Sequence, residues 1–100
     1  MGPASTVRIE GFIWLDEIED KLAGKHHVSV NEVEEVFEDE PKFRFVEKGH
    51  RTREDVYMAL GRTEAGRYLA VLFILKLNNV ALILSARDMA DNEKKYYGRR

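Results

Sequence analysis

Apolar residues near the N-terminus recur at helical spacing. In WLDEIEDKLAG they stand at positions 14, 15, 18 and 22, so they share one face of a helix. This spacing predicts a helix over residues 14–23. Gly24 follows at the position where a left-handed residue commonly ends a helix.

A second helix is predicted from its capping residues. Ser29 followed by Glu32 is a capping box, in which hydroxyl and carboxylate each accept a hydrogen bond from the other residue's backbone N–H, and Val28 and Val33 occupy the staple positions. We expect this helix to begin near Val30 and to end near Asp39, because Pro41 disfavours helical geometry just before it. The helical period turns Val33, Val36 and Phe37 inward and Glu34, Glu35 and Glu38 outward.

From Lys42 onward the hydrophobic pattern alternates, which predicts strands. Four apolar or alternating segments cover residues 42–48, 56–63, 67–76 and 80–87, and the third is nearly continuous, as is typical of a sheet centre. A turn at Glu64-Ala65-Gly66 separates the second strand from the third. Asn78-Asn79 suits a two-residue hairpin turn, because asparagine tolerates positive φ. That turn would place Ile74 opposite Ile83 and Phe73 opposite Leu84.

A last helix is predicted over residues 88–97. Asp88 can cap it, Met89, Ala90 and Tyr96 would turn inward, and Lys94 and Lys95 lie toward its C-terminal end, where cations are favoured. The resulting order, α-α-β-β-β-β-α, predicts an α+β fold: a four-stranded antiparallel sheet with two N-terminal helices and one C-terminal helix. We expect residues 1–100 to form a single domain, with residues 1–7 and 98–100 loose.

Composition narrows the class of protein. The sequence contains no cysteine, which excludes thiol nucleophiles and fits a reducing compartment. The segment MGPASTVRIEGF lacks the layout of a signal peptide, and the longest apolar run, Tyr68 to Leu75, is far shorter than the ~20 residues of a membrane span. We therefore expect a soluble, cytoplasmic protein.

The net charge of −2 conceals an asymmetry along the chain. Residues 1–41 carry 3 basic and 11 acidic side chains, whereas residues 42–100 carry 13 basic and 7 acidic ones. The second part could attract a polyanion, although a solvated charged surface explains the same counts.

Several kinds of catalytic site are poorly supported. His26 and His27 are adjacent, and consecutive side chains diverge, whereas Zn²⁺ needs three or four converging ligands. The serines lack a nucleophile-elbow sequence, and the glycines do not form a phosphate-binding loop. We predict neither a metal nor a cofactor.

RNA cleavage needs groups that this chain contains. Attack by the 2′-hydroxyl requires a base, an acid for the leaving 5′-oxygen, and cations that stabilise the phosphate. Residue type alone makes seven side chains candidates for these roles: Lys25, His26, His27, Arg62, Arg87, Tyr96 and Tyr97. Arginines at strand ends are also ordinary surface residues.

Three segments together resemble the BrnT family of bacterial toxin ribonucleases. They are WLDEIEDKLAGKHHVSVNEVEEVF, ALGRTEAGRYLAVLF and LSARDMADNEKKYY, and they cover roughly residues 12 to 97 in matching order. The resemblance implies a fold similar to that of RelE-type toxins and metal-independent RNA cleavage by 2′-hydroxyl transesterification. It also implies neutralisation by an antitoxin, BrnA, in a hetero-oligomer.

The resemblance also implies a set of site residues. By position, the expected catalytic residues are Lys25, His26, Arg62, Arg87 and Tyr97, and the expected RNA-binding residues are Tyr96, Arg67 and Lys94. Lys25 and His26 would manage protons or phosphate charge, and Arg62 and Arg87 would hold the scissile phosphate. We expect His26, Arg62 and Arg87 to meet in one cleft.

Four positions depart from the family pattern. Ile18, Glu19 and Leu22 stand where the family's first helix usually has a lysine and asparagines, and His27 replaces a glycine. Histidine at that position strains the backbone or narrows the site unless it adopts the left-handed conformation. The alternative hypothesis is therefore a noncatalytic module of the same fold that binds a protein partner. An unrelated small α+β protein is a third interpretation.

Overall fold

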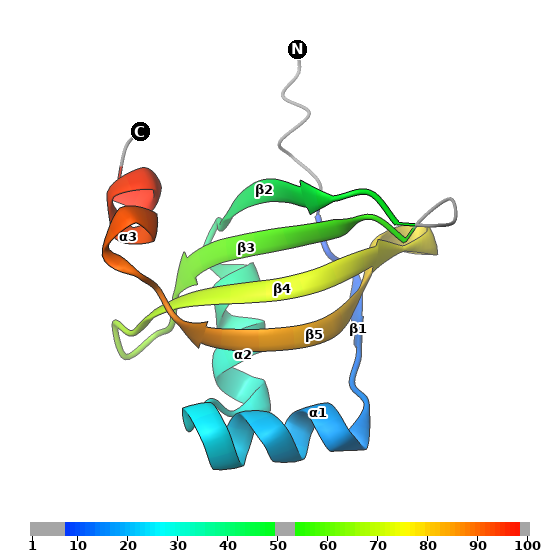
Figure 1. Cartoon of the computed structure of the whole chain (residues 1–100), viewed down its shortest axis with the longest axis horizontal. Helices are drawn as coiled ribbons and strands as arrows, with labels where there is room; N and C mark the ends of the chain where they lie inside the picture. The colour runs from blue at the N-terminus through cyan, green and yellow to red at the C-terminus, as the bar shows by residue number, and fades with distance from the viewer. Residues whose placement is uncertain (1–7, 50–53, 99–100) are drawn as a thin grey trace.

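A five-stranded mixed sheet organises the chain (Figure 1). The computed structural model describes residues 8–49 and 54–98. The strand order is β1-β5-β4-β3-β2, with β1 parallel to β5 and the other neighbours antiparallel. The strands are β1 (Gly11–Ile13), β2 (Lys42–Glu47), β3 (Val56–Arg62), β4 (Tyr68–Lys76) and β5 (Val80–Asp88). The helical segments are α1 (Asp16–Lys21), the π-helix η2 (Leu22–His26), α2 (Val30–Glu38), the short 3₁₀ turn η3 (Leu77–Asn79) and α3 (Asp91–Gly98).

The α+β class and the three main helices are confirmed, but the prediction of a four-stranded antiparallel sheet is wrong. The extra strand, β1, pairs in parallel with the start of β5, with Phe12 opposite Ala81. Glu10 N–H also donates to the Asn79 carbonyl, 2.8 Å away. Three residues are too few for an alternating pattern to appear, so tertiary pairing alone defines this strand.

The first helical segment begins and ends later than predicted, at Asp16 and His26. After α1 the chain continues as the π-helix η2. At its end Val28 N–H donates to the Leu22 carbonyl at 3.1 Å. The left-handed residue that closes this segment is His27 (φ 54°, ψ 43°), so the prediction of Gly24 as the cap is wrong. His27 thus adopts the left-handed conformation, the alternative to strain or a narrowed site at this position.

The second helix follows its predicted capping box. Glu32 N–H donates to Ser29 Oγ at 3.1 Å, and Ser29 N–H donates to Glu32 Oε1 at 3.0 Å. Val33 and Val36 are buried, and Phe37 packs beside them. These local signals fix both the start of α2 and the side that faces the sheet.

Helices lie on both faces of the sheet, and each face has its own core. η2 and α2 cover one face, where a large core forms around Phe73 with edge-to-face contacts from Phe37 and Phe43. On the other face, α3 covers only one end, where Met89 and Tyr97 pack on Leu60 and Ala70 (Figure 1). No helix among the described residues is long and apolar enough to span a membrane.

The turn between β4 and β5 has one residue more than predicted. Lys76 pairs with Val80, so Phe73 lies opposite Ile83 and Ile74 opposite Leu82, one residue away from the predicted pairs. Asn78 and Asn79 do have positive φ, 62° and 59°. A bulge between Leu72 and Phe73 then shifts the register back by one residue.

The C-terminal helix also starts later than predicted. Asp88 is the last residue of β5 and not a helix cap, and α3 begins at Asp91. Tyr97 is the inward residue, whereas Tyr96 is 37% exposed, so the prediction that Tyr96 turns inward is wrong. Gly98, expected to be loose, is the last residue of α3, and residues 1–7 and 99–100 lie outside the described residues.

Candidate functional site

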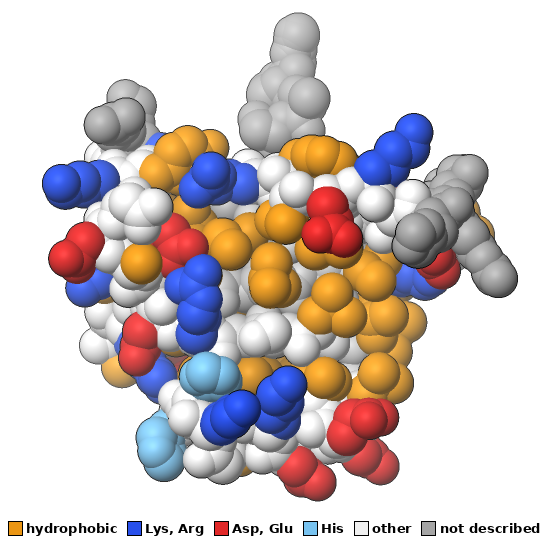
Figure 2. Space-filling model, viewed as in Figure 1, with side chains coloured by type: hydrophobic (Ala, Val, Ile, Leu, Met, Phe, Trp, Pro, Cys, Tyr) orange, Lys and Arg blue, Asp and Glu red, His pale blue; other side chains and the backbone are white. Residues whose placement is uncertain are grey.

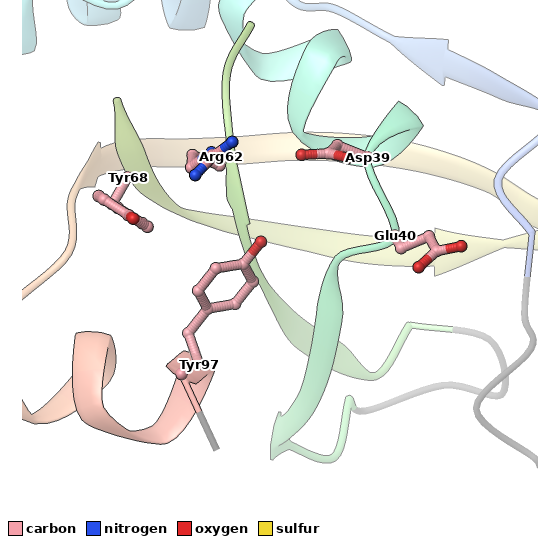
Figure 3. Close-up of a pocket in the computed structure, with 6 residues that line it drawn as sticks. Asp39, Glu40, Arg62, Tyr68 and Tyr97 are labelled. Carbon is pink, nitrogen blue, oxygen red and sulfur yellow. The ribbon is translucent and has the colours of Figure 1, made fainter. Parts of the chain in front are cut away.

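The sheet end where β3 finishes and β4 begins carries an open pocket. Arg62, the last residue of β3, pairs with Tyr68, the first residue of β4. Tyr97 reaches this point from α3, and its ring meets the Tyr68 ring edge-on, with centroids 6.0 Å apart. These three side chains line a pocket of about 350 Å³ together with Asp39, Glu40 and Gly98 (Figure 3).

The Arg62 guanidinium lies between tyrosines and carboxylates. Its central carbon is 6.0 Å from the centre of the Tyr68 ring. A hydrogen bond with Tyr68 raises the pKa of Arg62, and the charge of Asp39 raises it further. Figure 3 shows Tyr68 and Asp39 on opposite sides of Arg62, with the Tyr97 hydroxyl pointing toward the space between Arg62 and Asp39. An adjoining pocket continues the acidic side with Glu35, Glu38 and Glu64.

Arg67, predicted to bind RNA, instead holds the His26-His27 corner. Its Nη1 donates to the His27 carbonyl at 2.7 Å, and its Nη2 donates to the His26 carbonyl at 3.0 Å. Its Nε donates to Asp88 Oδ1 at 2.8 Å, which ties the end of η2 to the end of β5. These contacts engage both ends of the guanidinium and fix the backbone at His26.

Arg87 is also engaged. Its two Nη atoms donate to the two carboxylate oxygens of Glu93, at 2.7 and 2.8 Å. Glu93 is only 7% exposed and also accepts from Ala90 N–H at 2.8 Å, as the third residue of α3. The hydrogen bond from Arg87 lowers the pKa of Glu93, so this carboxylate is ionised at neutral pH. The pair joins β5 to the first turn of α3.

The Lys25-His26 corner lies beside this ion-pair network. Both residues end η2, with Lys25 exposed and His26 half-buried. The hydrogen bond from Arg67 is the main cause of the lowered pKa of Asp88, and attraction to His26 contributes to the same shift. His26 is therefore near Asp88.

The remaining candidates lie away from the pocket. Tyr96 faces β2, with Lys42 Nζ 5.0 Å and the Arg44 guanidinium carbon 4.8 Å from its ring centre. Lys42 Nζ also donates to the Tyr96 carbonyl at 2.7 Å. Lys94 is exposed on α3 and contributes to the lowered pKa of Asp88.

Apart from Tyr96 and Lys94, the predicted site residues lie in two neighbouring groups at one end of the sheet. Arg62 and Tyr97 share the pocket, and the residues that line it do not include His26 or Arg87. The second group centres on the network of Arg67, Asp88, Arg87 and Glu93. Described residues contain no group of three or more His, Asp or Glu side chains arranged to hold a metal ion.

Two side chains of the candidate site were not predicted from the sequence. Tyr68 was read only as the start of an apolar strand, although pairing across the Glu64-Ala65-Gly66 turn brings it opposite Arg62. Glu93 was not considered, although a glutamate at the third position of a helix commonly turns back to its start. A later start for the last helix would have indicated it.

Two of the four positions that depart from the family pattern, Ile18 and Leu22, belong to the core. Leu22 is 2% exposed, and Ile18 packs against the same core cluster. Neither side chain points at the pocket that contains Arg62. These apolar residues therefore anchor the first helix on the sheet.

A small α+β protein with arginines and tyrosines grouped at one end of its sheet belongs to the class that can bind phosphate groups. A family model described as the ribonuclease toxin BrnT of type II toxin–antitoxin systems matches residues 14–93. The chain therefore belongs to the BrnT toxin family. No curated protein matches it. Membership implies an RNA target and a protein antitoxin.

Proposed function

We propose that this chain is a metal-independent endoribonuclease toxin that cleaves RNA by attack of the 2′-hydroxyl. The observation that carries the proposal is the shared pocket of Arg62, Tyr68 and Tyr97 at the sheet end. A guanidinium and phenol groups in one open pocket can hold a phosphate and supply a hydrogen bond to an oxygen that gains charge. The family match supplies the RNA substrate.

The charges around Arg62 define the direction from which RNA approaches. Carboxylates of Asp39, Glu38 and Glu64 repel a phosphate on one side. Asp39 and Glu40 also line the pocket of Tyr68 and Tyr97, but the two tyrosines offer aromatic rings on which a base can stack. The scissile phosphate would therefore bind between Arg62 and Tyr97, with a flanking base against Tyr68.

The proposed reaction includes two proton transfers. A base removes the 2′-hydroxyl proton, the 2′-oxygen bonds to phosphorus, the bond from phosphorus to the 5′-oxygen breaks, and an acid protonates that oxygen. Tyr97 would donate a hydrogen bond to a phosphate oxygen beside Arg62. His26 and Lys25 would join the reaction from η2, whose end Arg67 holds in place.

Arg87 can hold a phosphate only if it exchanges partners. The Glu93 carboxylate occupies the same bidentate geometry that a phosphate would take. We propose that RNA displaces this contact. Because the Arg87 side chain is 42% exposed, solvent and an incoming phosphate can both reach it.

The wider family expectations belong to the same proposal. The sheet would correspond to that of RelE-type toxins, and a BrnA-like antitoxin would neutralise the chain in a hetero-oligomer in the cytoplasm. These assignments rest on family membership alone and do not depend on the geometry of the pocket.

The test is an RNA cleavage assay with the purified full chain in EDTA. We expect cleavage that leaves 2′,3′-cyclic phosphate and 5′-hydroxyl ends, reduced about 10²-fold or more by Arg62→Ala or Tyr97→Phe. Lys76→Ala is the matched control, because it removes a cation at the opposite end of β4. Cleavage that requires an added divalent ion, or that survives both pocket substitutions, would contradict the mechanism.

A noncatalytic partner-binding module is the second candidate. The observation that favours it is the full engagement of Arg67 and Arg87 by carboxylates. This candidate predicts no RNA cleavage above background by the wild-type chain, together with a stable complex with a protein partner. The same assay therefore separates the two functions.

A further inference from the structure

The sheet face that α3 leaves open carries an aliphatic strip. Val56 pairs with Ile74, Met58 with Leu72, and Ile74 with Leu82, so these five side chains share one face of β3, β4 and β5. The alternation along β3 places them on the same face as Leu60, which α3 covers. Figure 2 shows apolar side chains gathered on this side of the molecule.

The strip belongs to neither core. All five residues are half-buried, and apart from Met58 none packs against either core cluster. A half-buried apolar surface that spans three strands is the kind of surface that a partner covers. The strip lies on the same sheet face as Arg87, which pairs with Ala70.

The chemistry of the strip favours a protein over RNA. Its side chains are aliphatic, and it lacks the aromatic rings on which bases stack. At the end nearest α3, cations border the strip on both sides. Arg44 of β2 pairs with Met58, and Arg87 of β5 lies two residues beyond Ser85, which pairs with Leu72. At the opposite end lie Glu47, which pairs with Val56, and Lys76, which follows Ile74 by two residues on the same face and forms an ion pair with Glu54. The border is therefore positive at the end next to α3 and of mixed charge at the other end.

We propose that this strip is the docking surface for an apolar segment of the antitoxin, with acidic residues at the end of the segment that lies next to α3. The apolar side chains would cover Leu72, Ile74 and Leu82, and the carboxylates would face Arg44 and Arg87. The identity of the partner follows from family membership. If the antitoxin carboxylates bind Arg87, they would also block the phosphate contact proposed for Arg87. This inhibition rests on the proposed ribonuclease function, whereas the docking itself does not.

The experiment measures binding of the full chain to the protein encoded by the reading frame next to its gene, by titration calorimetry. We expect Ile74→Glu to weaken binding about tenfold or more, because it places a charge under the apolar segment. Leu77→Glu is the matched control: Leu77 is 58% exposed in the turn after β4, and the change should alter affinity less than about twofold. Arg44→Glu should weaken binding, with an effect that fades at high salt.

Several outcomes would overturn the proposal. They are no complex with the neighbouring protein, equal binding by the Ile74 and Leu77 variants, or a dimer of the chain alone that Ile74→Glu dissociates. Loss of RNA binding by Ile74→Glu with unchanged partner affinity would make the strip an RNA surface instead. If Ile74→Glu lowers the melting temperature strongly, Leu82→Ser and Leu72→Ala repeat the comparison. RNA cleavage by the wild-type chain is scored separately, so failure of the proposed function remains distinguishable.

Discussion

The ion pair between Arg87 and Glu93 yields the sharpest prediction about stability. Glu93 links α3 to two other parts of the chain: its oxygens accept from Arg87 on β5 and from Ala90 N–H just before α3. Glu93→Gln keeps the size of the side chain, removes its charge and leaves one oxygen as acceptor. The substitution therefore isolates the charged part of this link.

The size of the effect follows from the burial of the two partners. A hydrogen bond to a charged group contributes about 1.5–3 kcal/mol, and a charge left buried without its partner costs more. The Arg87 side chain is 42% exposed, so its guanidinium regains water when Glu93 is neutral. We therefore expect Glu93→Gln to lower the free energy of unfolding by about 1–2 kcal/mol. For a domain of this size, that corresponds to a melting temperature lower by roughly 4–8 °C per kcal/mol.

The effect should depend on pH in a defined direction. The hydrogen bond from Arg87 lowers the pKa of Glu93 in the folded state below its value in the unfolded chain. Its contribution to stability is thus fully present above the unfolded pKa, roughly 4.3, and is lost as the pH falls through the folded pKa. The difference in unfolding free energy between wild type and Glu93→Gln should be constant near neutrality and shrink in acid.

Urea unfolding followed by circular dichroism at several pH values measures this difference. Asp91→Asn is the control, because it removes one negative charge from the same turn of α3, and its side chain is exposed. We expect the control to cost less than about 0.5 kcal/mol. Equal losses in the two variants, or a loss in Glu93→Gln that does not change in acid, would refute a specific role for the pair.

Three further predictions test the corner and the site. His27→Gly should raise the unfolding free energy by about 1 kcal/mol, because glycine adopts positive φ without strain; no gain in thermal melts would show that His27 carries no strain here. Arg67→Lys should lower stability by about 1–3 kcal/mol and speed hydrogen exchange at Val28 N–H, since lysine cannot hold both carbonyls; unchanged exchange would contradict the clamp. Glu93→Gln should lower the KM for RNA if Arg87 binds phosphate, and a raised KM would contradict that exchange.

Local signals in the sequence predicted the parts of the fold that depend on local interactions. The Ser29–Glu32 capping box determines the start of α2, and the inward positions Val33 and Val36 follow from it. β1 could not be predicted because three residues carry no periodic pattern. The end of the first helix was misjudged because Gly24 is the usual residue for a left-handed cap, whereas tertiary contacts place that conformation at His27.

For the candidate site, the sequence indicated some of the residues but not the contacts that they make. Arg62 and Tyr97 were named, and they share a pocket. Arg87 was expected to hold the scissile phosphate and Arg67 to bind RNA, and carboxylates and backbone carbonyls contact both guanidinium groups. Which arginine pairs with which acid depends on the strand register and on where α3 begins. Neither can be predicted from residue type. The single cleft expected for His26, Arg62 and Arg87 remains a prediction.

The bulge between Leu72 and Phe73 explains why Arg87 is on the α3 face at all. With the register observed next to the turn, where Phe73 pairs with Ile83, a regular ladder would set Arg87 opposite Leu69 and Ser85 opposite Val71. Leu69 and Val71 are fully buried in the large core, so a charge and a hydroxyl would enter it. The bulge moves the pairing by one residue and sets Arg87 opposite Ala70, within reach of Glu93. The three-residue turn and the bulge thus compensate each other, and the α3 face gains a cation that a regular ladder would have directed into the large core.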